Sequence, residues 1–183
     1  AGYDIVLIET VGVGQSETVV AQMSDLFLLL LAPAGGDELQ GVKRGIMEIA
    51  DMILVNKADG DLKPQAMRTC ADYAGALRLL RKRSQDPEGF PKAMIVSALE
   101  TIGIADAWDE MQALITWRRE TNIWERSRAA QARYWFAEEV RLQLLARIAR
   151  DPDLGARMAM LEKEVAAGRM SPAAAAAEVV AQT

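Results

Sequence analysis

Short runs of apolar residues alternate with amphipathic stretches along the first two-thirds of the chain, and this alternation most constrains its fold. The apolar runs cover residues 5–8, 26–31, 52–55 and 93–96. Strands of this length without polar alternation are typical of a sheet buried on both faces. Strands that alternate with helices form βαβ units and a parallel sheet. We therefore expect an α/β domain with a parallel sheet over residues 1–119.

Helices are expected between these strands because apolar residues recur there at intervals of three and four. Ser16 has the side chain of an N-cap, and Gly60-Asp61 precedes another helical pattern. The expected helices cover residues 18–23, 40–49, 67–80 and 104–115.

No strand pattern follows Arg119, and residues 120–183 are expected to form an all-helical arm. Residues 121–149 predict one long helix with two apolar stripes. The first stripe holds Trp135, Leu142, Leu145 and Ala149, and the second holds Phe136, Val140 and Leu144.

Two proline breaks divide the rest of the arm. Asp151-Pro152 ends the long helix and begins a second one, because proline is favoured at the first helical position. Gly168 is a suitable residue just past the end of that helix, and Ser171-Pro172 begins a last helix that runs to residue 180. The expected core of the second helix is Leu154, Met158, Leu161 and Val165.

Composition excludes several classes of function. The net charge of −5 argues against a nucleic-acid partner, because neutralising phosphates needs an excess of Lys and Arg. The chain has no His and a single cysteine, Cys70, which excludes a His-based catalyst and the usual zinc sites. Its longest apolar run, residues 26–32, is too short to span a membrane. A cytoplasmic protein is the expectation.

The sequence Asn56-Lys57-Ala58-Asp59 directly follows the strand over residues 52–55. Open α/β sheets bind ligands at the carboxyl ends of their strands. The Asp59 carboxylate can accept two hydrogen bonds from the N1–H and N2–H₂ groups of guanine, whereas adenine has no matching donors. The Lys57 stem can lie over the base and Asn56 can brace the loop. The alternative is an ordinary polar turn, for which Asn and Asp are common residues.

The next strand along the chain ends in Ser97-Ala98-Leu99. A backbone N–H at Ala98 can donate to guanine O6 and repel the amino group of adenine. A Ser-Ala pair alone carries little information, and its place one strand after the N-K-x-D sequence gives it weight.

A third loop, Glu9-Thr10-Val11-Gly12-Val13-Gly14-Gln15-Ser16-Glu17, follows the first apolar run. Glu9 at a strand tip is expected to hold Mg²⁺ directly or through water. Gly12 allows the backbone to approach a γ-phosphate, and Gln15 is a candidate for positioning the attacking water. The alternative is a tight glycine-rich turn.

The stretches ETVGVGQSE, AGGDELQGVKRG, NKADGD and SAL resemble the methylmalonyl-CoA mutase-associated GTPase family (MeaB/ArgK), and the resemblance extends through DPDL, LEKEV and AAGRMSP to the end of the chain. It implies a P-loop NTPase-type sheet and an arm that forms a homodimer. It also implies binding of GTP or GDP with Mg²⁺ and a chaperone role toward an adenosylcobalamin-dependent acyl-CoA mutase, including cofactor loading and protection. Asp37, Glu38 and Lys43 match a switch loop of the family.

The chain departs from the family in one respect: no G-x-x-x-x-G-K-[ST] sequence occurs in its 183 residues. This predicts the C-terminal part of a GTPase domain, expected to be inactive by itself. Three alternatives stay open. A nickel metallochaperone of the same class would need His or Cys ligands, and an ATPase or kinase is disfavoured by Asp59 and Ala98. A non-enzymatic dimerisation or mutase-interaction module is the third.

Overall fold

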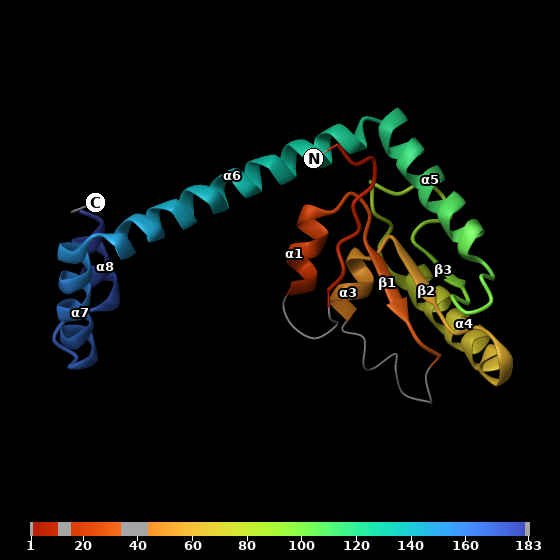
Figure 1. The fold of residues 1–183 in the computed structure, drawn as a ribbon, viewed down its shortest axis with the longest axis horizontal. Coiled ribbons are helices and arrows are strands. Elements are labelled where there is room, and N and C mark those ends of the chain that lie inside the picture. The colour runs from red at the N-terminus through yellow and green to blue at the C-terminus, as the bar shows by residue number, and fades with distance from the viewer. Residues whose placement is uncertain (1, 11–15, 34–43, 182–183) are drawn as a thin grey trace. The chain divides into compact units, whose positions relative to one another are not determined.

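The computed structural model describes residues 2–10, 16–33 and 44–181 (Figure 1). The chain divides into two compact units, Ala1–Gln131 and Ala132–Thr183. The division falls inside one long helix, α6 (Ile123–Arg150). The boundary after residue 119 that we expect between a nucleotide domain and an arm stays a prediction.

A three-stranded parallel sheet forms the centre of the first unit. Strands β1 (Leu28–Leu31), β2 (Met52–Val55) and β3 (Lys92–Ile95) pair in the order β1-β2-β3. All four residues of the central strand β2 are buried. The expected α/β class and three of the four expected strands are confirmed, because all-apolar four-residue runs need cover on both faces.

Helices cover both faces of this sheet (Figure 1). Helices α3 (Arg44–Ile49) and α4 (Lys63–Leu79) bury one face in a cluster of Met47, Ala50, Ile53, Tyr73 and Leu77. Helix α5 (Ile104–Glu120) packs Ala107 against Met52, Leu54 and Val96 on the other face. The alternation of Ile53 with Met52 and Leu54 between the two clusters is the period of two of a strand. The described elements also include helix α1 (Ser16–Met23) and the 3₁₀ turn η1 (Gly60–Leu62).

The expected strand over residues 5–8 is wrong. Residues 5–8 have no regular secondary structure, and Val6 and Leu7 are 71% and 86% exposed. A strand exists only where a neighbour accepts its backbone hydrogen bonds, and no described strand pairs with this segment. A run of apolar residues indicates a preference for burial, but it does not show which strand would pair with it.

A buried ion-pair network holds the amino ends of the strands. Asp51, directly before β2, accepts hydrogen bonds from the Arg118 guanidinium at 2.5 and 3.3 Å and from the Phe27 N–H at 2.8 Å. Arg118 also contacts Asp86 at 3.2 Å, and Arg83 bridges Asp86 and Asp51 at 2.5 and 2.9 Å. Burial lowers the pKa of Arg118, but its hydrogen bonds and charge pairing with Asp51 and Asp86 outweigh burial and leave that pKa raised. The network therefore pins the end of α5 to the sheet.

The second unit consists of the rest of α6 with α7 (Pro152–Ala166) and α8 (Pro172–Val180). Leu161, Ala175 and Val179 form its buried cluster. The expected breaks are confirmed: the helices begin at Pro152 and Pro172, as expected for proline at the first helical position.

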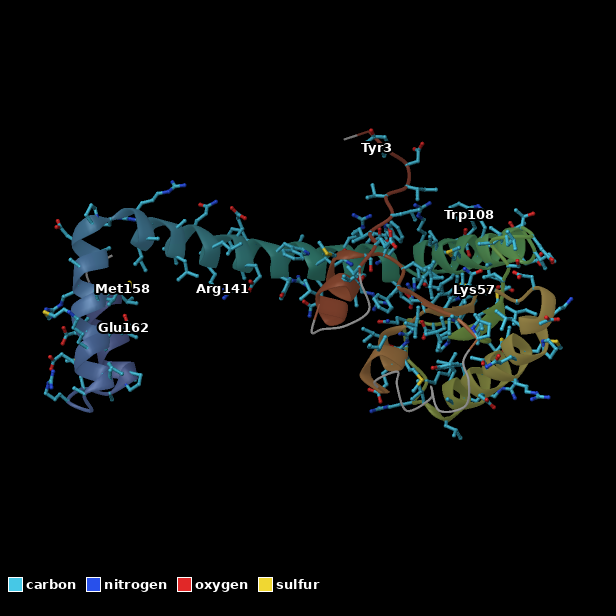
Figure 2. All side chains as sticks on the ribbon, turned by 60° about the horizontal axis from the view of Figure 1, so that its bottom comes forward. Tyr3, Lys57, Trp108, Arg141, Met158 and Glu162 are labelled. Carbon is cyan, nitrogen blue, oxygen red and sulfur yellow. The ribbon has the colours of Figure 1, made fainter. Side chains whose placement is uncertain are left out.

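The side chains that cap these two helices are those expected from the breaks. Asp151 caps α7 through the N–H groups of Asp153 and Leu154, and Ser171 caps α8 through the N–H of Ala174. Met158, expected in the core, is instead 47% exposed on α7 (Figure 2). Within the described ranges, no helix is long and apolar enough to cross a membrane.

We predict that Arg118→Ala lowers the free energy of unfolding by about 3–5 kcal/mol, because it leaves the two buried carboxylates of Asp51 and Asp86 with one cationic partner, Arg83. Urea unfolding followed by circular dichroism measures this change. Arg119→Ala is the matched control, since Arg119 is exposed on the same turn. Equal effects of the two substitutions would show that the network does not hold α5.

Candidate functional site

The loop after β2 leaves the sheet in a tight, strained turn. The Asn56 N–H still continues the ladder to the Leu31 carbonyl at 2.8 Å, and the Ala58 N–H donates to the Val96 carbonyl at 3.1 Å. Lys57 between them has a φ of 60°, in the left-handed region that non-glycine residues rarely adopt. This turn buries Ala58 and sends the Lys57 side chain to the surface where β2 ends (Figure 2).

The loop after β3 is closed by its own backbone. Ser97 and Ile102 exchange two N–H···O bonds of 2.9 and 3.1 Å in an isolated antiparallel bridge. Gly103 follows with a φ of 70°, and a Cβ atom there would lie 2.7 Å from the Ile95 carbonyl oxygen. Any other residue at 103 would therefore push the loop away from β3.

Ser97 links the two loops. Its side chain is fully buried, and its hydroxyl donates a hydrogen bond to Asp59 Oδ2. The Ser97 hydroxyl oxygen in turn accepts a hydrogen bond from the Glu100 N–H at 3.0 Å. Because the hydroxyl is held from both sides, it fixes one Asp59 oxygen and leaves Oδ1 to accept from a ligand.

Asn56 makes a second link between the loops. Its Oδ1 accepts from the Lys57 N–H at 2.8 Å and from the Ala98 N–H at 3.0 Å. Two donors identify the oxygen side of this amide, so its NH₂ group is free to donate. The Ala98 N–H, which we expect to bind guanine O6, is engaged here, and O6 must share or replace that bond. The neighbouring N–H of Leu99 forms no hydrogen bond within the described residues.

The result is one polar edge with complementary groups. Asp59 offers a half-buried carboxylate acceptor, and Asn56 and Leu99 offer donors within the same pair of loops. Cys70 packs beneath them against the cluster of Val55 and Ala58, and burial raises the pKa of its thiol. This thiol therefore serves as packing rather than as a nucleophile at the site.

The structure does not place Glu9 at a strand tip as expected. Glu9 is exposed in the segment without regular structure, because the strand before it does not form. Among the described residues no group of three or more His, Cys, Asp or Glu residues can hold a metal ion. The other expected phosphate and switch residues lie outside the described ranges: Gly12, Gln15, Asp37, Glu38 and Lys43.

Comparison with known protein families identifies the family of the chain that carries this edge. The model of the family "Methylmalonyl Co-A mutase-associated GTPase MeaB" matches residues 1–153. The chain belongs to the MeaB family. The resemblance in the short sequences around Asp59 and Ser97 is thereby confirmed at the level of the family.

Individual relatives of this MeaB-family chain come from animals and bacteria. The methylmalonic aciduria type A homolog of Mus musculus is 43% identical over 96% of the chain and 42% of its own length. The GTPase ArgK of Escherichia coli K12 is 39% identical over 79% of the chain and 43% of its own length. A crystal structure described as LAO/AO transport system kinase matches the whole chain and 58% of its own, with a TM-score of 0.73 and 31% identity. The chain thus spans about half the length of the relatives it matches.

The residues that shape the second loop were not predicted from the sequence. The Ser97 turn is held by backbone groups of Glu100, Ile102 and Gly103. Backbone contacts of this kind are possible for many residue types, so the sequence gives little indication of them. The one available signal is the glycine six residues after Ser97, just before a helical pattern, because such positions often need a positive φ.

We predict that Ser97→Ala speeds hydrogen exchange of the Glu100 amide about five- to tenfold, because one hydrogen bond of about 1 kcal/mol is lost. The Ile102 amide, which bonds to the Ser97 backbone, should change less than about twofold. Exchange followed by two-dimensional NMR measures both signals, with the exposed Ser84→Ala as control. Unchanged exchange at Glu100 would remove Ser97 from its linking role.

Proposed function

We propose that this chain is the guanine-recognising part of a GTPase that assists an adenosylcobalamin-dependent acyl-CoA mutase in loading and protecting its cofactor. The observation that carries the proposal is the Ser97–Asp59 hydrogen bond in a MeaB-family chain. It presents the Asp59 carboxylate at the carboxyl edge of the sheet, where guanine N1–H and N2–H₂ can donate to it. The family description supports the mutase as partner.

Each group at the edge has a place in this proposal. Asp59 accepts from the N1 and N2 edge of guanine, and the Asn56 NH₂ donates to the base while its oxygen braces the loop. The exposed Lys57 stem covers the ring. The N–H groups of Ala98 and Leu99 supply donors for O6. Adenine carries an amino group where guanine carries O6, so the same donors would face another donor.

The groups that would bind the phosphates of the nucleotide are not among the loops described above. A P-loop would supply the amide cradle and lysine for the phosphates, and none occurs in these 183 residues. GTP or GDP is the proposed ligand, and Mg²⁺ would supply charge neutralisation at the phosphates, with Glu9 as the proposed carboxylate. We expect no GTP hydrolysis by the chain without a phosphate-binding loop.

The helical arm has a separate proposed role in forming a homodimer. Helix α6 has no buried residue, although Phe136, Leu142 and Leu145 are apolar and 72%, 54% and 53% exposed. A face of this kind favours a protein partner. A second copy of the chain is the simplest partner, since two-fold dimers are the commonest assemblies of soluble proteins.

A cytoplasmic location is also part of the proposal. The relatives include both a mitochondrial and a bacterial protein, so their names do not decide the location.

We predict that Asp59→Asn weakens GDP binding about 10–100-fold and reverses the preference toward xanthosine diphosphate. The amide can donate to the carbonyl that xanthine carries where guanine has its amino group. Calorimetric titration of both nucleotides tests this in a protein that carries the upstream phosphate-binding loop expected from the resemblance.

The control for this titration is Asp61→Asn, an exposed aspartate two residues further along the chain. It removes the same charge without touching the proposed contact, so its GDP affinity should stay within about twofold of the parent. A GDP preference that persists in Asp59→Asn would show that Asp59 does not read the base.

For the arm, we predict that Leu142→Glu with Leu145→Glu converts a dimer into a monomer, because two charges cannot be buried in an apolar interface without partners. Light scattering coupled to size exclusion gives the mass. Gln143→Glu is the control, since it adds a charge at an exposed polar position beside Leu142. A parent chain that is monomeric at about 100 μM, or a double variant that still dimerises, would contradict the role.

A further inference from the structure

An open pocket of about 930 Å³ lies in the first unit at the far end of α4. The loop over residues 80–91 and the start of β3 form its other walls. The pocket is thus on the amino side of the strands, whereas Asn56 and Ser97 follow the carboxyl ends of β2 and β3. It is a different place from the guanine-recognising edge.

The charged lining of this pocket is almost entirely cationic. Five of its side chains are Arg or Lys, and Glu48 is its only acid. Two of these cations are occupied: Arg83 binds Asp51 and Asp86, and Lys92 binds Glu110 at 2.5 Å. The other three have no ion-pair partner among the described residues: Arg78, Arg81 and Lys82. Three cations on one pocket, without ion-pair partners in the described part of the chain, produce a positive potential there, which favours an anionic ligand.

The position of these cations argues against a role in helix stability alone. A cation in the last turn of a helix interacts favourably with its dipole, which accounts for Arg78. Helix α4 ends at Leu79, and Leu80 is extended, so Arg81 and Lys82 lie beyond the turn in which the dipole acts. The charges of Arg81 and Lys82 are therefore available to bind an anionic ligand.

The walls of the pocket are formed before any ligand binds. Arg83 donates to the Glu48 and Ile49 carbonyls at 3.2 and 3.1 Å in addition to its two ion pairs. Turns within the loop add the Asp86 N–H to the Arg83 carbonyl and the Phe90 N–H to the Pro87 carbonyl, both at 3.3 Å. A wall that is already ordered reduces the entropy lost on binding.

The pocket also has an apolar part. Leu77, Leu80, Phe90 and Pro91 contribute to its lining. Its volume is within the range of about 300–1,000 Å³ that holds organic ligands, and it is much larger than an inorganic ion needs. Guanidinium groups match phosphate oxygens in geometry as well as in charge.

We propose that this pocket binds an organic phosphate, in which a phosphate or pyrophosphate group contacts Arg78, Arg81 and Lys82 and an apolar or heterocyclic body lies against Leu77 and Phe90. The ligand is a small molecule distinct from the guanine nucleotide of the proposed function. Its site is separate from the base-reading loops, so the two can be occupied together.

ADP is a suitable probe, because it combines a pyrophosphate with a ring system that Asp59 does not favour. In two-dimensional NMR titrations of the chain, ADP should shift the amide signals of residues 77–93, with a Kd below about 1 mM. Inorganic pyrophosphate should bind at least about tenfold more weakly, since it lacks the organic body. Arg81→Gln with Lys82→Gln should weaken ADP about tenfold or more.

Lys63→Gln with Arg68→Gln is the matched control, because both side chains are exposed on the other half of α4 and the charge change is the same. Its ADP affinity should stay within about twofold of the parent. The proposal is overturned if ADP causes no shifts at about 5 mM, shifts only residues 56–60 and 97–99, or binds the Arg81/Lys82 variant equally well. Equal affinity for pyrophosphate, or tighter binding of a hexaglutamate peptide, would also overturn it.

Discussion

The parallel pairing of β2 between β1 and β3 is the constraint on which the rest of the first unit depends. Because the three strands run in one direction, all of their carboxyl ends reach the same edge, and all of their amino ends reach the other. Asn56 follows β2 and Ala98 lies just after β3, so two residues 42 positions apart in the chain meet in a hydrogen bond. The burial of all four β2 residues makes any slip of this register costly, since one step would reverse the two faces.

The two edges of the sheet carry different chemistry. At the amino edge, Asp51 and Arg118 form a buried pair. Arg118 also donates to the Asp25 carbonyl, and Asp51 also accepts from the Phe27 N–H and from Arg83. At the carboxyl edge, the Ser97 hydroxyl holds Asp59 from one side only, so the carboxylate keeps capacity for a ligand. The network at the amino edge, whose groups are bonded to one another, stabilises the fold. The carboxylate at the carboxyl edge, which still has acceptor capacity, can bind a ligand. Helix α5 connects them, since it begins after Gly103 and ends beside Arg118.

Much of this arrangement could be predicted from the sequence. The runs that form β1, β2 and β3, the proline starts of α7 and α8, and the meeting of the Asp59 and Ser97 loops all follow from local patterns together with the parallel rule. The strand over residues 5–8 was wrong because an apolar run does not specify its neighbour. The Arg118 network could not be foreseen, since Arg118 stands in a basic run typical of an exposed face and its partners lie at least 32 positions away.

The central claim is that the carboxyl edge of β2 and β3 recognises guanine through Asp59. A crystal structure with GDP, of a protein that includes a phosphate-binding loop, tests it most directly. The account predicts guanine N1 and N2 within about 3.2 Å of the Asp59 carboxylate, with the Ser97 hydroxyl still bound to the same carboxylate. A base that lies elsewhere, or an Asp59 carboxylate more than about 4 Å from the ring edge, would contradict it.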